Sequence, residues 1–157
     1  MSVREVLLHP HPVLTSRASP AADAGAVVED LLDTMKSFGH CVGIAAPQIG
    51  ELVRVAVVDV SGHPKAPESH GLLVLVNPVI VASEGSEVGR EGCLSIPELT
   101  ANVRRATAIT VEAEGLRVDA AGFEARAIQH EIDHLDGLLF LDRVESLDAD
   151  VFRRRRK

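Results

Sequence analysis

The segment QHEIDHLDG, residues 129–137, places two histidines four residues apart with an acidic residue between them. In a helix of 3.6 residues per turn, His130 and His134 project from the same face, one turn apart. Two imidazoles at this spacing are typical ligands of one metal ion, and Glu131 lies close enough to move the protons of an attacking water. The segment therefore predicts a helix with a mononuclear metal site, whose third ligand must come from elsewhere in the chain.

Two segments have the apolar period of a helix, residues 24–39 and residues 123–135. Gly39 ends the first segment and Gly137 lies just after the second, and a Ser-Pro pair at positions 19 and 20 favours a start slightly upstream of the first helix. The second predicted helix contains the histidine pair, so the metal site is expected on a helix with one apolar side.

Strand-like segments fill much of the chain between the two predicted helices. Segments rich in β-branched residues predict strands at 52–60 and 72–76, with a loop of Pro, Gly and Ser at 61–71. Residues 102–113 and 116–119 predict a hairpin around the Glu-Gly pair at 114–115. Because helices and strands do not alternate regularly, we expect an α+β fold, mostly antiparallel sheets packed around a central metal-binding helix.

Composition and charge limit the class of protein. Hydrophobic residues make up 46% of the 157 and charged residues 25%, as in a globular protein, and we expect one domain over residues 1–157. No apolar run approaches the roughly 18 residues of a membrane span, and the N-terminus has no signal-peptide pattern, so a cytoplasmic protein without membrane contact is expected.

The charge is unevenly distributed along the chain. The basic tail, residues 153–157, carries five positive charges, so the first 152 residues sum to −12 (−7 minus 5). An acidic body argues against a general nucleic-acid surface, and no specific nucleic-acid partner is predicted. The tail is expected to be a solvated, disordered end, with docking to a partner as the alternative.

The segment EGCLSIP, residues 91–97, offers a third ligand. The two cysteines of the chain are too few for a disulfide framework. A Cys93 thiolate is a strong ligand for a divalent ion, and together with the two histidines it would leave a fourth position open, as a catalytic site requires. The alternative is that Cys93 is a small buried hydrophobe.

A third segment, GIAAPQIG, residues 43–50, combines small residues with one amide side chain. The Gln48 amide could stabilise the oxyanion of a tetrahedral intermediate. The alternative is a tightly packed loop on which Gln48 is exposed.

In this order, GIAAPQ, EGCLSIP and QHEIDHLDG resemble the three signature motifs of peptide deformylases. The resemblance runs from about residue 6 to residue 141 and includes GFEARAIQHE, which leads into the metal helix. It implies a metal-dependent hydrolase that removes the N-formyl group from formylmethionyl peptides of nascent proteins and releases formate. It also implies ferrous iron in the cell, with zinc, nickel or cobalt as alternatives, and makes the ribosome a candidate partner.

The resemblance also implies roles for single residues. Cys93, His130 and His134 correspond to the metal ligands, and Glu131 to the general acid/base. Gln48 and the backbone N–H of Leu94 correspond to the oxyanion donors.

Further positions correspond to substrate contacts and to support of the metal loop. Gly43 matches the glycine whose backbone approaches the substrate. The residues that match the pocket for the methionine side chain are Val42, Phe123 and Ala127. Glu91 and Arg105 match a family ion pair.

The chain departs from the family pattern at three places. Cys41 stands where many members have glycine, and Thr100 stands where some have arginine. The chain after the metal helix is also too short for the long C-terminal helix of some members.

Two other functions fit part of the pattern. A metalloprotease would share the histidine pair, but the protease signatures place a third His or Glu ligand downstream, and no histidine follows His134. A non-catalytic module with structural zinc would need four protein ligands, with Cys41 as a conceivable fourth.

Overall fold

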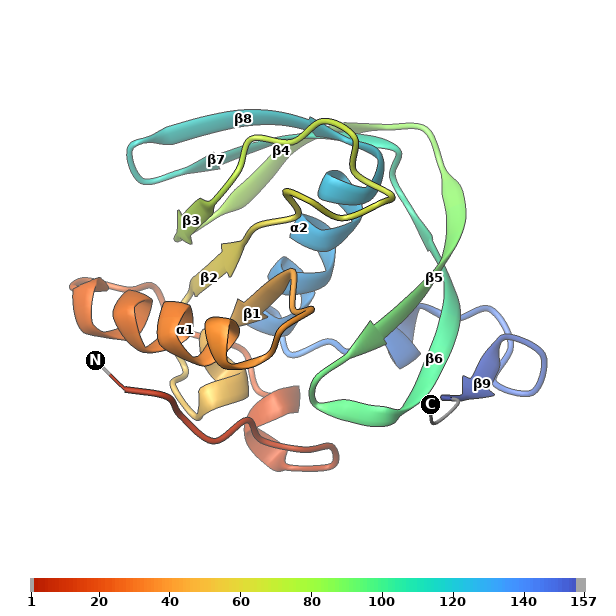
Figure 1. Ribbon diagram of the computed structural model, residues 1–157, viewed down its shortest axis with the longest axis horizontal. Coiled ribbons are helices and arrows are strands. Elements are labelled where there is room, and N and C mark those ends of the chain that lie inside the picture. Colours follow the sequence, from red (N-terminus) through yellow and green to blue (C-terminus); the bar gives the residue numbers. More distant parts are fainter. Residues whose placement is uncertain (1, 155–157) are drawn as a thin grey trace.

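The computed structural model describes residues 2–154 (Figure 1). Two α-helices, α1 (Gly25–Ser37) and α2 (Gly122–Leu135), combine with nine strands and three short 3-10 helices. The strands are β1 (Gly43–Ala45), β2 (Val55–Val58), β3 (Leu73–Val76), β4 (Val79–Glu84), β5 (Glu87–Cys93), β6 (Ile96–Arg105), β7 (Ala108–Ala113), β8 (Leu116–Ala121) and β9 (Val151–Arg153). The 3-10 helices are η1 (Pro12–Thr15), η2 (Ala46–Ile49) and η3 (Phe140–Arg143).

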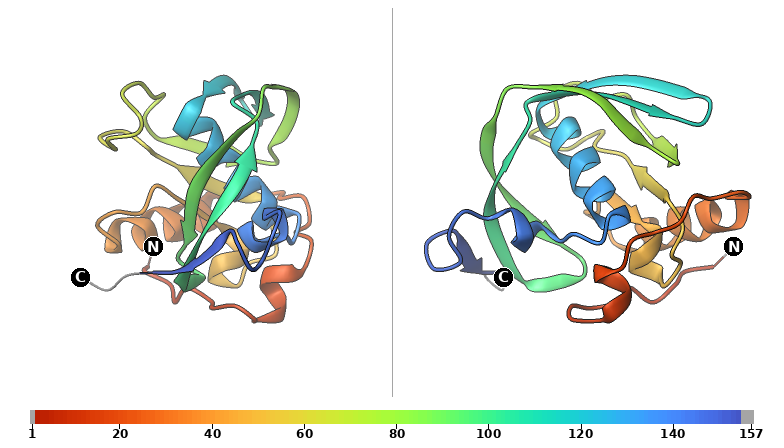
Figure 2. Two further views of the ribbon diagram at one scale, coloured as in Figure 1. Left: turned by 90° about the vertical axis from the view of Figure 1, so that its right-hand side faces the viewer. Right: turned by 180° about the vertical axis from the view of Figure 1, so that it is seen from behind.

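The strands form three sheets of three strands each, in the orders β1-β2-β3, β4-β7-β8 and β5-β6-β9. Every pairing within these sheets is antiparallel. Figures 1 and 2 show α2 in the middle of the molecule with sheets on several sides. The predicted α+β fold around a central helix is therefore confirmed.

The main apolar core joins α2 to two of the sheets. Ala125, Ile128 and Ile132 of α2 pack with residues of β2 and β3 on one side and of β7 and β8 on another. The central position of α2 explains why its polar residues are buried, since sheets cover several of its faces at once.

The prediction of one strand over 102–113 is wrong, because residues 106 and 107 separate two strands, β6 and β7. The side chain of Gln129 on α2 accepts a hydrogen bond from the Ala106 N–H (3.1 Å) and donates one to the Ala106 carbonyl (3.0 Å). A residue bonded through both backbone groups to a helix cannot continue a strand ladder. The hairpin itself is confirmed as β7 and β8, with Gly115 in the left-handed region at φ +70°.

Other predicted boundaries also shift. The strand over 52–60 shortens to β2, and the Leu52 carbonyl accepts a hydrogen bond from the Ser19 N–H instead of joining the sheet. For the same reason Ser19 does not begin a helix; α1 begins at Gly25, after Ala24. Strands β1, β4, β5 and β9 were not predicted.

Part of the basic tail is ordered, which contradicts the expectation of a disordered end. Arg153 pairs with Leu99 in the β9–β6 ladder, and the Arg154 N–H donates to the Glu98 carbonyl at 2.7 Å. Residues 155–157 lie outside the described residues. Among the described helices, none combines the length and apolarity that crossing a membrane needs.

Candidate active site and metal centre

Helix α2 brings three polar side chains of the motif into the interior. His130, Glu131 and His134 are all buried. The helix follows β8 directly, beginning at Gly122, whose φ of +58° turns the chain from strand to helix. Gly137 ends the segment at φ +79°, and a Cβ there would lie 2.9 Å from the Thr15 carbonyl oxygen. A glycine is thus needed at this stop both for conformation and for space.

Cys93 reaches the histidine pair from the end of β5. A register shift between Gly92 and Cys93 interrupts the β5–β6 ladder at this point. The Cys93 Sγ lies 3.4 Å from the His134 Nε2, and the ligand atoms of Cys93, His130 and His134 all lie within 4.8 Å of one another. Cys93 therefore meets His130 and His134 in space, although it precedes them by 37 and 41 positions in the sequence.

The donor set fits a divalent transition metal. One thiolate and two imidazoles are ligands that such ions share, and three protein ligands leave one position open. The Cys41 thiol does not join the group: its Sγ donates to the Gly43 carbonyl at 3.1 Å, and the described cluster contains only three residues. This arrangement disfavours a closed structural zinc site.

The surroundings of Cys93 favour its thiolate form. Burial raises the pKa of the Cys93 thiol, but the adjacent His134 and His130 lower it by a larger amount. The pKa of this thiol therefore lies well below the ordinary value. Burial lowers the pKa of His130, whereas its contacts with Cys93 and Glu91 raise it well above the ordinary imidazole value. A thiolate held by positive charge is the form in which cysteine binds metals.

Glu131 sits beside this cluster with an unsatisfied oxygen. Its Oε1 is buried and has no hydrogen-bond partner among the described residues. Burial raises the pKa of Glu131 above its usual range, even though His130 and His134 act in the opposite direction. A Cβ at position 43 would lie 2.8 Å from the Glu131 Oε2, so Gly43 is what allows the strand to pass this carboxylate.

Gln48 faces the metal-ligand cluster from η2. Its Oε1 accepts from the Ala45 N–H at 2.9 Å, which turns its Nε2 towards Ser95 Oγ (3.1 Å) and Cys93 Sγ (3.6 Å). Gln48 is buried, so the alternative of an exposed amide is wrong. Leu94 lies in the turn between β5 and β6, next to Cys93. Sequence reasoning missed Ser95, although it lies inside the quoted EGCLSIP segment.

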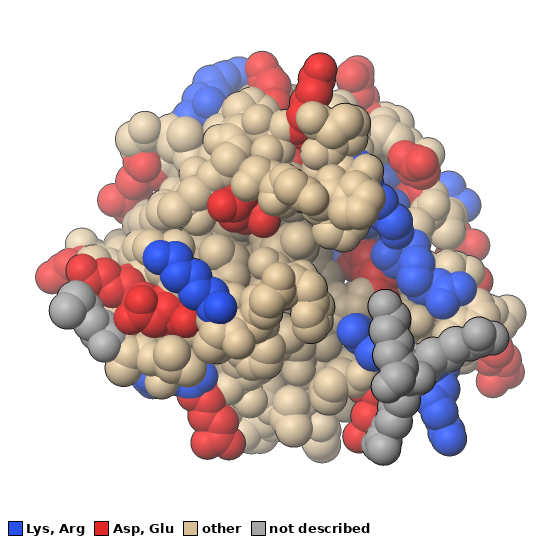
Figure 3. All heavy atoms as spheres, in the orientation of Figure 1, with Lys and Arg blue, Asp and Glu red and all other residues tan. Residues whose placement is uncertain are grey.

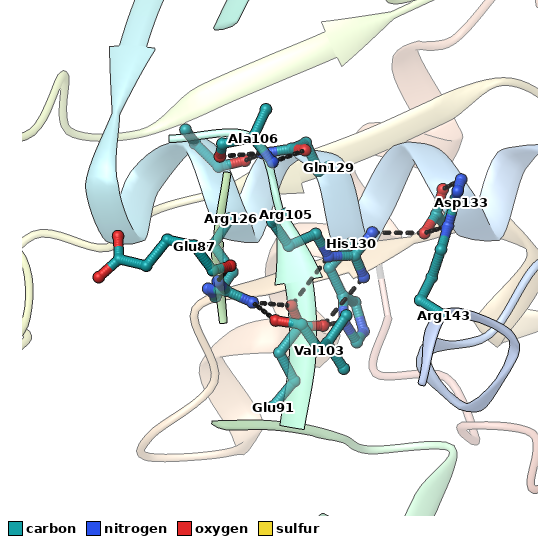
Figure 4. A network of polar contacts seen from close by, with 11 residues as sticks. Glu87, Glu91, Val103, Arg105, Ala106, Arg126, Gln129, His130, Asp133 and Arg143 are labelled. Atoms are coloured by element: carbon teal, nitrogen blue, oxygen red, sulfur yellow. Dashed lines mark hydrogen bonds and ion pairs between the residues drawn. The ribbon is translucent and has the colours of Figure 1, made fainter. Parts of the chain in front are cut away.

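A network of charged side chains around Glu91 contacts His130 next to the candidate metal centre (Figure 4). Glu91 accepts hydrogen bonds from Arg105 (2.8 and 2.9 Å), Arg126 (2.8 Å) and His130 Nδ1 (2.9 Å). The predicted Glu91–Arg105 pair is therefore confirmed. Burial raises the pKa of Glu91, but hydrogen bonds from Arg105 and His130 lower it more, so that it lies far below its usual range.

The two aspartates of the motif, Asp133 and Asp136, contact arginines and not the imidazoles. Asp133 accepts from Arg105 at 2.5 Å and from Arg143 at 2.8 and 3.1 Å. Asp136 accepts from Arg54 at 2.8 Å. Glu91 takes the orienting role at His130, because β5 rather than the helix's own next turn lies beside its Nδ1.

The remaining predicted residues lie along one apolar cluster. Val42, Phe123 and Ala127 pack in the cluster that covers α2, and the His63 ring stacks on Phe123 with centroids 4.3 Å apart. Phe123 and Ala127 precede His130 and Glu131 by one to two helical turns, so this cluster extends from the candidate metal centre towards the start of α2.

A buried Cys-His-His cluster beside an unpaired carboxylate defines a class of protein, the metal-dependent hydrolases. The family model for polypeptide deformylase matches residues 3–150. Peptide deformylase 2 of Vibrio cholerae is 40% identical over 96% of this chain and 92% of its own length, and the peptide deformylase of Thermodesulfovibrio yellowstonii is 36% identical over 100% and 98%. The crystal structure of a peptide deformylase from Legionella pneumophila superposes with a TM-score of 0.83 at 35% identity, covering 93% of this chain and 88% of that one.

The chain belongs to the peptide deformylase family. It is a metal-dependent enzyme that removes the N-formyl group from nascent peptides. The metalloprotease and the non-catalytic module are thereby set aside.

Proposed function

We propose that Cys93, His130 and His134 hold the catalytic metal ion and that this ion is ferrous iron in the cell. The close approach of the three donor atoms supports the ligand set. The donor types also suit zinc, nickel and cobalt, so the choice of iron rests on the family resemblance. When bound, such an ion supplies two effects, a lower pKa for a coordinated water and polarisation of the formyl carbonyl.

Glu131 moves the protons in the proposed reaction. It accepts a proton from the attacking water and passes it to the nitrogen that leaves as a free amine, while the carbonyl carbon leaves as formate. The unpaired, buried Oε1 and the raised pKa of Glu131 support this role, since a general acid/base must both take and release a proton near neutral pH.

Gln48 and the backbone N–H of Leu94 stabilise the oxyanion in this proposal. The Gln48 Nε2 is held at the cluster by the bond from Ala45 to its Oε1, so it is oriented before substrate arrives. Losing one such donor typically costs about 2.7–4 kcal/mol of transition-state stabilisation.

The substrate is a formylmethionyl peptide, with Gly43 facing its backbone and Val42, Phe123 and Ala127 around the methionine side chain. Two observations support this placement. A Cβ at Gly43 would lie 2.8 Å from the Glu131 Oε2, and the three pocket residues share one apolar cluster. A crystal structure of an Acinetobacter baumannii peptide deformylase bound to Met-Ala-Ser has a TM-score of 0.80 to this chain at 33% identity, covering 91% of this chain and 100% of that one.

Residues 1–157 act as one catalytic domain in this proposal, working in the cytoplasm on nascent chains, with the ribosome as a candidate partner. The packing of α2 against residues of two sheets in one core supports the single domain. The relatives match nearly the whole chain, which supports it as well.

The observation that carries the proposal is the convergence of Cys93 with the histidine pair, and reconstitution with metal tests it. Protein prepared anaerobically with ferrous iron is given formyl-Met-Ala-Ser or acetyl-Met-Ala-Ser, and formate or acetate release is measured. We expect release from the formyl peptide alone, because Gly43 leaves room for the smallest acyl group. Cys93→Ser is expected to lose bound iron, and Cys41→Ser to keep it. Full metal occupancy in Cys93→Ser, or loss of metal in Cys41→Ser, would refute the ligand set.

A further inference from the structure

A groove of about 440 Å³ lies between β5 and the first turn of α2, and Phe123 forms part of its wall. Phe123 also packs into the apolar cluster that contains Val42 and Ala127. The groove therefore adjoins the proposed methionine pocket, with Phe123 shared between the two.

The wall of this groove is cationic. Lys65, Arg90 and Arg126 line it together with a single acidic residue, Glu87. Figure 3 shows Lys and Arg side chains gathered on the β5 and β6 side of a hollow in this face. In a chain with a formal net charge of −7, such a local excess of positive charge is unusual.

Arg126 differs from the other cations because it is buried and fixed. Its side chain is 11% exposed and donates at 2.8 Å to the Glu91 carboxylate, to the Val103 carbonyl and to the Glu87 carbonyl. These bonds use the two Nη1 hydrogens and one on Nη2. The Nε–H and the second Nη2–H have no acceptor among the described residues, so two of the five guanidinium donors remain for a ligand.

Gly89 makes room for this guanidinium. A Cβ at position 89 would lie 2.9 Å from the Arg126 Cζ and 3.0 Å from its Nε. Gly89 on β5 thus leaves space in which Arg126 of α2 is held as a charged donor at the groove wall. A guanidinium cannot lose its proton in a protein, so it donates at every physiological pH.

We propose that Arg126 forms the polar end of the pocket for the first side chain and hydrogen-bonds an oxygen acceptor there, so that the substrates include formyl peptides beginning with methionine sulfoxide. The inference rests on the proposed function. Methionine sulfoxide keeps the length of methionine and adds a strongly polar oxygen. A wholly apolar pocket would reject that oxygen, because burying it without a hydrogen bond costs free energy. Arg126 supplies the missing donor.

The test compares two substrates in the same enzyme. The ratio of kcat/KM for formyl-Met(sulfoxide)-Ala-Ser to that for formyl-norleucyl-Ala-Ser is measured in the iron-loaded wild type and in Arg126→Met. Because both rates come from one preparation, the ratio does not depend on metal occupancy or on the folded fraction. We expect the ratio to fall at least fivefold in Arg126→Met, and a smaller fall overturns the proposal.

Arg90→Met is the matched control. Arg90 belongs to the same groove but is engaged elsewhere: its guanidinium lies 3.9 Å from the centroid of the Phe152 ring and donates to Thr100 and Asn102. Its ratio should stay within twofold of the wild type. An equal fall in Arg90→Met would show that general positive charge is responsible, and it would overturn the assignment to Arg126.

Two further measurements separate the possible failures. Absence of formate release by wild type from formyl-Met-Ala-Ser refutes the proposed function itself, whereas release with an unchanged substrate ratio refutes only the role of Arg126. If Arg126→Met has no activity on either peptide, Gly89→Ala replaces it, since the added methyl group displaces the guanidinium. The ratio is expected to fall at least threefold in Gly89→Ala, and an unchanged ratio again overturns the proposal.

Discussion

Two buried glutamates stand beside the histidines of the metal helix, and their surroundings are opposite. Glu91 accepts hydrogen bonds from Arg105, Arg126 and His130, which together lower its pKa in spite of burial. Glu131 is buried to a similar degree, yet its Oε1 has no described partner and burial raises its pKa. Depth in the protein is therefore not what sets the charge of these carboxyl groups.

The difference fits the two proposed roles, support of the site for Glu91 and proton transfer for Glu131. A carboxylate surrounded by fixed donors stays ionised and holds its imidazole in one orientation, as the outer partners of metal ligands do. A carboxyl group without donors is free to exchange a proton during a reaction. The surroundings of Glu91 and Glu131, and not the residue type, are therefore expected to set the role of each.

The largest effect is expected for Glu131→Gln, which keeps the shape of the side chain and removes its proton exchange. We expect kcat for formyl-Met-Ala-Ser to fall by about 10²–10⁴-fold, the usual contribution of a general acid/base. The free energy of unfolding should stay the same or rise, because an unpaired buried carboxyl group is replaced by a neutral amide. Formate release and urea denaturation measure these two quantities, and metal content is measured to compare the preparations.

Glu112→Gln is a suitable control for that experiment. Glu112 lies on β7, its side chain is 48% exposed, and it pairs with Arg117 at the surface. The substitution Glu112→Gln should change neither turnover nor the free energy of unfolding measurably. Wild-type turnover in Glu131→Gln would remove this residue from the mechanism and erase the proposed contrast with Glu91.

Glu91→Gln is expected to act mainly on stability. The substitution leaves Arg105, Arg126 and His130 without their shared negative charge in a buried site. Removing one partner of such a pair typically costs about 3–5 kcal/mol. At about 3 °C per kcal/mol for a chain of this length, Tm should fall by about 10 °C. Thermal unfolding at matched metal content measures the change.

An exposed ion pair supplies the comparison for this substitution. Glu145 pairs with Arg104 at 3.0 Å, but its side chain is 68% exposed. Glu145→Gln should cost less than about 1 kcal/mol. If both variants lose the same stability, the burial of the Glu91 network is not what stabilises it.

The histidine pair and its helix could be predicted from sequence because the information is local. A four-residue spacing places two side chains on one helix face in any fold. Cys93 and Gln48 lie 41 and 86 residues from His134, and they were assigned through the resemblance of three motifs rather than from spacing alone. In the structure the Gln48 Nε2 lies 3.6 Å from the Cys93 Sγ, which lies 3.4 Å from the His134 Nε2.

The partners within the network could not be predicted, because they depend on which strand lies beside which face of α2. Asp133 lies between the two histidines in sequence. In the fold it points to Arg105 and Arg143, while Glu91 reaches His130 across 39 residues of chain. The position of Arg126 likewise depends on β5 and β6, because its guanidinium donates to groups on these strands and Gly89 leaves room for it.

The smallest effect we predict is the pH dependence of the stabilisation that Glu91 contributes. Its pKa in the folded protein lies far below the ordinary value of 4.5, which the unfolded chain is expected to have. Above that value the carboxyl group is ionised in both states, and its stabilisation is fully present. As the pH falls below it, the unfolded chain takes up a proton that the folded protein does not, so the free energy of unfolding decreases.

The size of this loss follows from the two protonation states. Between pH 6.5 and pH 3.5 the contribution of Glu91 should fall by about 1.4 kcal/mol, given an unfolded pKa near 4.5 and a folded carboxylate that stays ionised. The stability difference between wild type and Glu91→Gln should narrow by this amount, measured by urea denaturation of the metal-free proteins so that acid release of the metal does not contribute. A difference that stays constant over this range would mean that Glu91 is not held ionised, and the contrast between the two glutamates would then rest on Glu131 alone.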